Sequence, residues 1–258
     1  MKGQVTLSIA DSVAHVTLSH PGKLNAMSRV MWQELRTVFE AIQQDAALRC
    51  VLLAGAGGNF CAGGDISEYA AFRFEEASLR QFHDELVWGG LQAVLDCDVP
   101  IVAQIEGACM GAGLEIASCC DLRLAGASAK FGAPIAKLGF PMAPRELALV
   151  MGAAGELTAR EMLLSAAVLD AQAVAQRGFL HRVLPDQDLA DEAVMMASRV
   201  KRLAPQAARL NKQAFRALAH TRRALAATDS ITNPYAYAAS AEHREGVTAF
   251  VDKRSPQF

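Results

Sequence analysis

Hydrophobic and polar residues alternate along the first 20 positions of the chain. The segments VTLSIA and VAHVTLS each alternate, and a polar pair, Asp11 and Ser12, separates them. Alternation with a period of two on both sides of a short polar turn predicts a β-hairpin. The period then changes, because the apolar residues from Val30 to Ile42 recur on one face of a helix that Ser28 can cap.

Three short apolar runs follow this helix. They are CVLLAG (50–55), PIVAQIEG (100–107) and DLRLAGA (121–127). Continuous apolar runs of this length are typical of strands that are buried on both faces. Strand, turn and helix recur along the chain without a detectable sequence repeat, so we expect an α/β fold whose strands are flanked by helices.

From about Leu157 the pattern is almost wholly helical. The segment TAREMLLSAAVLDAQAVAQRG reads as one helix that ends at Gly178, and Pro185 interrupts the pattern. Three more helical segments follow it: DLADEAVMMASRVKRLAP, QAARLNKQAFRALAH and AEHREGVTAFVDKR. The basic residues from Lys201 to Arg223 indicate either a nucleic-acid face or the solvated side of two amphipathic helices. We favour the second interpretation, because Phe215 is the one aromatic ring there for base stacking.

Composition and charge narrow the class of protein. A chain of 258 residues, 52% of them hydrophobic, can bury a sizeable core. The net charge of −2 gives no attraction for nucleic acid or an anionic membrane, and no apolar run is long enough to span a bilayer. The six cysteines lack metal-ligand spacing, so we expect free buried thiols, no disulfide and no zinc. The N-terminal residues resemble no signal or transit peptide, which predicts a soluble cytoplasmic protein.

Two glycine-rich turns carry the candidate chemistry. In GGNFCAGGDISEY (57–69), Asp65 and Glu68 stand at capping-box spacing and predict a helix that begins there. In GACMGAGLEIASCCD (107–121), Glu115 is alone in an apolar stretch. Each could be an ordinary tight turn, but together they offer free backbone N–H groups at two helix N-termini that could bind one oxyanion. A phosphate-binding P-loop is excluded because no Gly-Lys-Ser/Thr follows either turn.

Four motifs in combination resemble the enoyl-CoA hydratase/isomerase, or crotonase, family. They are PGKLNAM, NFCAGGDI, PIVAQIEGACMGAGLEIASCCDLRLA and AKFGAPIAKLG, and EGVTAFVDKRSPQF resembles the C-terminal end of that family. The resemblance implies a crotonase-like spiral of ββα units over residues 1–195, which would bind acyl-CoA and carry out catalysis, and a helical trimerisation region over residues 196–258. It also implies an acyl-CoA substrate with no permanently bound cofactor, and a homo-oligomer that is a trimer or a hexamer of two trimers.

The same resemblance assigns roles to individual residues. The backbone N–H groups of Gly64 and Ala112 would form an oxyanion hole, with Ala112 standing where many relatives have glycine. Glu115 matches the first of two catalytic glutamates, and burial would raise its pKa towards the range useful for proton transfer. A structural role for Glu115, in hydrogen-bonding a neighbouring loop, is the alternative. The coenzyme A part would be held by Lys23, by Ala62, Gly63, Asp65 and Ile66, and by Lys253 from a neighbouring subunit. Asp65 and Asp121 also read as structural residues that cap or pin turns.

One position departs from the family pattern. Ile135 occupies the place of the second hydratase glutamate, in FGAPIAKLG, and an isoleucine can neither hold nor polarise water. Glu115 could work alone, or another side chain could substitute. The candidates are Glu146, which follows Arg145, and the pocket-segment residues Tyr69, His83 and Asp84.

Three functions remain open at this point. Hydration of a 2-enoyl-CoA, or its reverse, is the leading reaction that the family resemblance implies. Double-bond isomerisation, or decarboxylation of a malonyl-type thioester, is an alternative that needs the oxyanion hole without a two-carboxylate water site. A non-catalytic acyl-thioester-binding subunit is the alternative from another class.

Overall fold

The computed structural model describes residues 2–225 and 233–258, apart from the side chains of residues 219–225. The predicted hairpin is present, because β1 (Gln4–Ala10) and β2 (Val13–Ser19) pair in antiparallel register. The six-stranded sheet then continues with parallel strands, in the order β1-β2-β3-β4-β6-β9. These strands are β3 (Cys50–Gly55), β4 (Ile101–Ile105), β6 (Leu122–Gly126) and β9 (Arg182–Leu184). The three apolar runs are therefore strands, as predicted.

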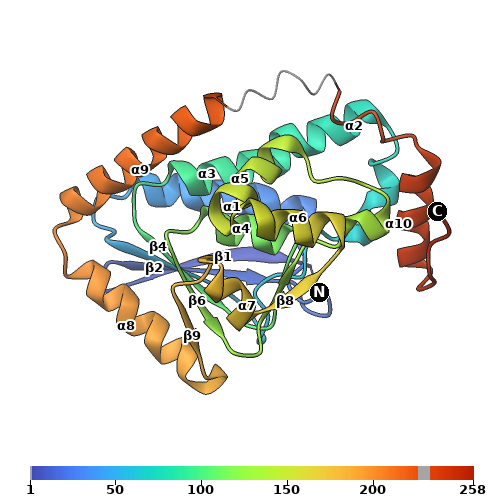
Figure 1. The fold of residues 1–258 in the computed structure, drawn as a ribbon. Helices are drawn as coiled ribbons and strands as arrows, with labels where there is room; N and C mark the ends of the chain where they lie inside the picture. Colours follow the sequence, from blue (N-terminus) through green and yellow to red (C-terminus); the bar gives the residue numbers. More distant parts are fainter. Residues whose placement is uncertain (1, 226–232) are drawn as a thin grey trace.

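Helices cover both faces of this sheet (Figure 1). On one face lie α1 (Arg29–Gln44), α3 (Trp88–Asp96) and α4 (Ala112–Cys119), over the main hydrophobic core. On the other face lies α8 (Leu189–Lys201), which packs on β3, β4 and β6. Alternate residues of one strand consequently enter different cores: Val51 and Leu53 face the main core, whereas Leu52 faces α8. This double burial explains why the strands read as unbroken apolar runs.

The helix that the sequence predicts after Ser28 forms as α1. The Ser28 hydroxyl accepts a hydrogen bond from the Met31 N–H, which caps the helix. Most of its apolar stripe is buried, including Trp32, Leu35 and Phe39, whereas Val30 at its start is exposed.

A smaller sheet lies beside the main one. It consists of β5 (Ala108–Met110), β7 (Lys130–Gly132) and β8 (Val168–Asp170). The strand β5 pairs in parallel with β7, and β8 pairs antiparallel to β7. This sheet connects the second glycine turn to the FGAPIAKLG motif.

The prediction of one long helix from Thr158 to Gly178 is wrong for the middle of this segment. The chain forms α6 (Glu156–Leu164), leaves the helix near Ala166, which has a φ of 53°, and then forms β8 before α7 (Ala171–Gln176). Strand pairing with β7 outweighs the helical pattern here, and the Asp170 side chain starts α7 by accepting a hydrogen bond from the Ala173 N–H. The predicted end is confirmed, since Gly178 follows α7 with a φ of 84°.

The remaining helical elements lie between the first glycine turn and the C-terminal end of the chain. They are η1 (Ile66–Ala71), α2 (Glu76–Gln81), η2 (Phe82–Val87), η3 (Ile135–Leu138), α5 (Pro144–Ala154), η4 (Asp186–Asp188), α9 (Pro205–Leu225) and α10 (Ala241–Val251). In Figure 1, α9 runs along one side of the molecule and α10 lies at the opposite end. The C-terminal helix α10 packs against η1 and η3 of its own chain. The domain boundary predicted at residue 195 falls inside α8 and stays a prediction.

The basic residues of α9 do not form the solvated face that the sequence suggested. Arg209 donates to the Asp45 and Leu48 carbonyls, Lys212 is buried against Asp121 at 2.8 Å, and Arg216 pairs with Asp98 at 2.8 Å. These cations attach α9 to the body of the protein, because strand-end carbonyls and carboxylates there need donors. The Arg223 side chain lies outside the described residues.

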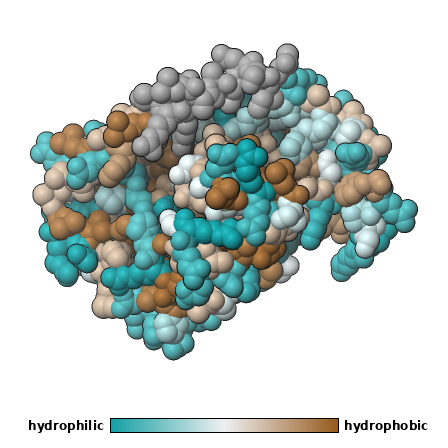
Figure 2. Space-filling view, in the orientation of Figure 1, coloured by the Kyte–Doolittle hydropathy of each residue, from teal (hydrophilic) through white to brown (hydrophobic). Residues whose placement is uncertain are grey.

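The outward side of α9 is instead partly apolar. Phe215 and Leu218 are 74% and 66% exposed, and Leu210 is also exposed. Figure 2 shows hydrophobic side chains among hydrophilic ones over α8 and α9. The amphipathic pattern of α9 is therefore present, with its polar side facing the protein.

The six cysteines are free thiols and all are buried, as the sequence predicted for their side chains. Burial raises the pKa of Cys50, Cys61 and Cys120 to about 12, so these thiols stay protonated. Among the helices of the described residues, none is long and apolar enough to cross a membrane.

Candidate active site

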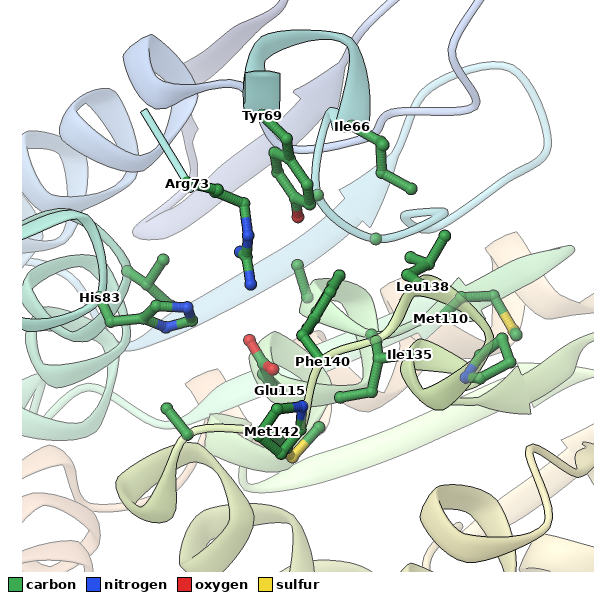
Figure 3. Close-up of a pocket in the computed structure, with 18 of the residues that line it drawn as sticks. Ile66, Tyr69, Arg73, His83, Met110, Glu115, Ile135, Leu138, Phe140 and Met142 are labelled. Atoms are coloured by element: carbon green, nitrogen blue, oxygen red, sulfur yellow. The ribbon is translucent and has the colours of Figure 1, made fainter. Parts of the chain in front are cut away.

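A cavity of about 260 Å³ lies between the two glycine turns, η3 and α10 (Figure 3). Many residues singled out from the sequence line it together: Ala62, Gly63, Gly64, Ile66, Tyr69, His83, Ala112, Glu115 and Ile135. Lys23, Asp65, Asp84, Glu146 and Lys253 are not part of the lining. The apolar walls include Phe82, Val87 and Phe140. The cavity thus combines an apolar enclosure with a few polar groups, as small-molecule sites do.

The two glycine turns lie side by side, as their proposed joint role requires. Cys61 and Cys109 form a parallel bridge: the Cys61 N–H donates to Ala108 at 2.8 Å, and the Met110 N–H donates to Cys61 at 2.9 Å. Within the part of the chain that the structure describes, the N–H groups of Gly64 and Ala112 donate to no protein acceptor. Two unpaired N–H groups therefore line one cavity, and each is available to a ligand oxygen.

Local backbone requirements explain the glycines in these turns. Gly111 has a φ of 47° and precedes the first residue of α4, so the unusual conformation falls on Gly111 and Ala112 starts a regular helix. An alanine at position 112 is therefore compatible with a donor at that place. A side chain at Gly64 would overlap the Tyr69 hydroxyl, so only glycine fits beside that ring.

Glu115 lies in the first turn of α4, three residues after Ala112, and its carboxyl group points into the cavity. Burial raises its pKa to about 8, and the neighbouring Glu146 adds to the rise, while Arg73 opposes it. The carboxyl group forms no hydrogen bond with any residue in the described ranges. It is free to exchange a proton with a ligand, and the catalytic role itself remains a prediction.

A histidine and a carboxylate form a pair on the wall of the cavity. His83 Nδ1 lies 3.0 Å from Glu146 Oε1, and their side chains are 12% and 3% exposed. Glu146 is in the first turn of α5, where the helix N-terminus favours a negative charge. Among buried side-chain atoms of the described chain, His83 Nε2 is the one without a hydrogen-bond partner. The residue lines the cavity, but this nitrogen atom itself is buried, so a change in the His83 side chain is needed before a ligand or water contacts it.

Arg73 is a cavity residue without a sequence prediction, and it lies in the wall opposite Glu115 (Figure 3). Its guanidinium lies 4.4 Å from the centre of the Tyr69 ring and 4.0 Å from that of Phe140. The available signal was an arginine between two phenylalanines, in AAFRFEE, within a segment expected to line the acyl pocket.

The predicted coenzyme A residues are partly brought together. Lys23 Nζ lies 2.6 Å from Asp65 and 2.7 Å from the Ser67 hydroxyl, so this lysine is at the 61–66 loop. Asp65 caps η1 by accepting from the Ser67 N–H, whereas Glu68 accepts from the Arg29 N–H and does not close the predicted capping box. The Asp65 reading as a structural residue is confirmed, but the binding role stays a prediction.

Two other expectations concern residues outside this loop. Asp121 accepts from the Ile101 N–H at 2.7 Å, which confirms that it pins the start of β4. Lys253 follows α10, a helix that contributes Phe250 to the cavity of its own chain. A role of Lys253 at a neighbouring subunit stays a prediction. No group of three or more potential metal ligands is found among the residues with described placement.

The sheet topology and the paired turns define an α/β protein with a crotonase fold, which solved structures share over nearly their whole length. The model of the enoyl-CoA hydratase/isomerase family matches residues 8–258, and the chain belongs to this family. It is 30% identical over 246 residues to a probable enoyl-CoA hydratase of Mycobacterium bovis. The aligned region covers 95% of this chain and 94% of that protein.

Two further relatives illustrate the range of the family. The chain is 31% identical over 257 residues to the 1,2-epoxyphenylacetyl-CoA isomerase of Escherichia coli, with 97% of this chain and 96% of that protein covered. The crystal structure of an enoyl-CoA hydratase/carnithine racemase from Magnetospirillum magneticum has a TM-score of 0.82 and 34% identity, covering 98% of this chain and 94% of that one. Similarity to hydratases and to an isomerase identifies the family and leaves several reactions open.

The raised pKa of Glu115 predicts how stability depends on pH. The unfolded chain releases this proton near the ordinary value of 4.5, whereas the folded protein holds it until about pH 8. The stability contributed by the protonated carboxyl is therefore complete below pH 4.5 and is lost as the pH rises towards 8. Glu115→Gln removes this loss, so the free energy of unfolding of the variant, relative to wild type, should increase between pH 5 and pH 8.

Urea unfolding at fixed protein concentration measures this difference. Glu75→Gln is the matched control, because Glu75 is exposed and makes no side-chain cap hydrogen bond. A difference between Glu115→Gln and wild type that does not change with pH would show that the pKa of Glu115 is not raised.

Proposed function

We propose that the protein adds water to a 2-enoyl-CoA, or eliminates it from a 3-hydroxyacyl-CoA. The observation that carries this proposal is the convergence of two unpaired N–H groups, of Gly64 and Ala112, and the Glu115 carboxyl on one cavity. A thioester carbonyl between the two donors would develop enolate charge there. One such donor typically lowers the barrier by about 3 kcal/mol, which makes the pair the main source of rate enhancement.

Glu115 would move the proton at the carbon next to the carbonyl. It follows Ala112 by three residues on the same helix, so a carbonyl bound to the Ala112 N–H brings its α-carbon towards this carboxyl. At neutral pH the group is largely protonated, because its pKa is raised to about 8. It can therefore donate to the enolate during hydration and accept the same proton during elimination.

His83 would supply the second proton-transfer group, which Ile135 cannot. In the tautomer that the mechanism requires, Nδ1–H donates to the Glu146 carboxylate and Nε2 carries no proton. That nitrogen has no partner within the described chain but is buried, so the His83 side chain would have to shift for it to take the proton from the attacking water. The carboxylate of Glu146 then stabilises the imidazolium that forms, and Ile135 contributes only apolar surface.

Isomerisation of a double bond, or decarboxylation, is the second candidate. The apolar side chain of Ile135 at the cavity favours it, because both reactions need the oxyanion hole and a single proton-transfer group such as Glu115, but no activated water. A non-catalytic thioester-binding subunit is the candidate of another class.

The proposal includes a site for the coenzyme A moiety and an assembly. The support for a coenzyme A site is the half-exposed Lys23 beside the loop that holds Gly63 and Ile66. The support for a trimer or hexamer is the exposed apolar side of α9, with Phe215 and Leu218. The buried free thiols are consistent with a cytoplasmic location.

The first test is turnover of crotonyl-CoA, followed by the loss of absorbance of the conjugated thioester. We expect hydration by the wild type, and a fall in kcat/KM of about 10²- to 10⁴-fold in Glu115→Gln, because a positioned proton-transfer group contributes that much. Glu75→Gln should behave as wild type. Binding without turnover of any enoyl- or malonyl-type thioester would contradict an enzymatic function and favour the binding subunit.

The second test separates the two proton-transfer groups. His83→Gln should lower hydration by about 10²-fold or more, while Glu115-dependent deuterium exchange at the α-carbon of butyryl-CoA should stay near the wild-type rate. Glu146→Gln should lower hydration in the same way, because a neutral amide no longer stabilises the imidazolium. Equal losses of hydration and exchange in His83→Gln would indicate a structural role, and an unchanged hydration rate would exclude His83 as the base.

A further inference from the structure

Arg73 places a buried positive charge in the cavity without a carboxylate to neutralise it. The residue is 1% exposed and follows η1, in the segment that also supplies Tyr69. No Asp or Glu of the described ranges forms an ion pair with its guanidinium. Buried charges are normally paired, because removing an ion from water is costly without an opposite charge. The unpaired guanidinium therefore calls for an anion that the described chain does not supply.

The groups that do contact Arg73 are all neutral. Its Nη2 donates to the Tyr237 hydroxyl at 3.3 Å, and its Nε lies 3.5 Å from His243 Nε2. Burial lowers the pKa of His243 to about 4 and raises the pKa of Tyr237, so the imidazole and the phenol are uncharged at neutral pH. The guanidinium also lies against the rings of Tyr69 and Phe140, which meet edge to face. These contacts orient the guanidinium and leave Nη1 without a hydrogen bond to a described residue.

The acid nearest in the cavity does not remove this charge. Glu115 is the one Asp or Glu among the described residues of the lining, and the other charged or titratable members are Tyr69, Arg73, His83 and Lys137. Burial keeps Glu115 largely protonated below its pKa of about 8. The guanidinium thus has no carboxylate partner in the cavity, although Glu146 lies behind the wall against His83, and the apolar surrounding makes a charge interaction with a ligand strong.

We propose that Arg73 binds a carboxylate at the distal part of the acyl chain, so that the substrate class is a CoA thioester of a dicarboxylic acid. The inference rests on the proposed function in one respect, namely that the thioester carbonyl occupies the Gly64–Ala112 site. Arg73 faces Glu115 across the cavity (Figure 3). With the reacting carbons at Glu115, the carboxylate that binds Arg73 would belong to the part of the acyl chain beyond those carbons. The planar guanidinium offers parallel N–H donors that match a carboxylate, and its contacts with the Tyr69 and Phe140 rings and with the Tyr237 hydroxyl restrict their direction.

A purely structural role for Arg73 predicts different behaviour. In that case the guanidinium would only hold two residues to the cavity wall: Tyr237, which precedes α10, and His243, which lies in its first turn. Its removal would then weaken the fold and the binding of all acyl chains alike. A role in recognition predicts instead a change in the preference between charged and neutral acyl chains.

Binding of saturated thioesters tests this preference without depending on turnover. The probes are succinyl-, glutaryl- and adipyl-CoA, each compared with the isostere in which an isopropyl group replaces the terminal carboxylate: 4-methylpentanoyl-, 5-methylhexanoyl- and 6-methylheptanoyl-CoA. Isothermal titration with the wild type should give at least a tenfold lower Kd for one acid than for its isostere. If every isostere binds as tightly as its acid, the inference is wrong, whatever the result for hydration.

Variants assign the preference to the guanidinium. Arg73→Met should abolish it, Arg73→Lys should keep part of it, and Lys137→Met should keep all of it, because Lys137 is exposed at the cavity. A preference that survives Arg73→Met, or that disappears in Lys137→Met, would contradict the role of Arg73. If Arg73→Met does not fold, the wild-type ratio and the Arg73→Lys ratio still decide. Failure of the proposed function would appear separately, as absence of turnover of every 2-enoyl thioester.

Discussion

The pairing of two glycine turns through Cys61 and Cys109 is the interaction on which the site depends. The bridge aligns two strand-to-helix connections, and the Cys61 and Met110 N–H groups donate hydrogen bonds within it. The Gly64 and Ala112 N–H groups have no acceptor in the described chain. The sheet beneath fixes both turns, because β3 and β4 pair in parallel and deliver their C-terminal ends to the same edge. Two donors at a buried edge are costly unless a ligand oxygen satisfies them, which makes this the natural position for a thioester carbonyl.

The titratable groups around these donors divide into two sets with opposite environments. Glu115 is buried without a hydrogen bond, so its acid form is favoured and it can give a proton at neutral pH. Glu146 lies in the first turn of α5 and contacts His83. Two carboxyl groups in different environments can take different roles in one reaction, which is how a site supplies both an acid and a base. In the proposed hydration, His83 takes the proton-transfer role that Ile135 cannot have.

Sequence patterns predicted the strands of the main sheet and α1 because burial on one or both faces leaves a clear period. They failed between Leu164 and Ala171, where pairing with β7 stabilises a strand that has no pattern of its own. Gly64, Ala112 and Glu115 were assigned from the family resemblance, and the structure brings them to one cavity, while their roles stay predictions. The alternative roles of His83 and Glu146 were named from sequence, but their contact joins residues 63 positions apart and needed the fold.

The charge balance of the molecule also depends on tertiary contacts. No sequence pattern indicates the burial of Arg73, which the structure places against the rings of Tyr69 and Phe140. The basic residues of α9 read as a solvated face, yet Arg209 and Lys212 contact backbone carbonyls and a carboxylate of the body. In both cases the helical or loop pattern gives the position of a cation, and only the packing gives its partner.

The central claim, that Gly64 and Ala112 bind the thioester oxygen, is tested most directly by isotope-edited infrared spectroscopy of a thioester with a ¹³C-labelled carbonyl. Two hydrogen bonds to the carbonyl should lower its stretching frequency on binding to the wild type. Ala112→Pro removes one donor at the first position of a helix, where proline is tolerated, and should return the frequency part of the way to that of the free thioester. A bound thioester whose carbonyl frequency equals that of the free molecule would contradict the assignment of the oxyanion hole.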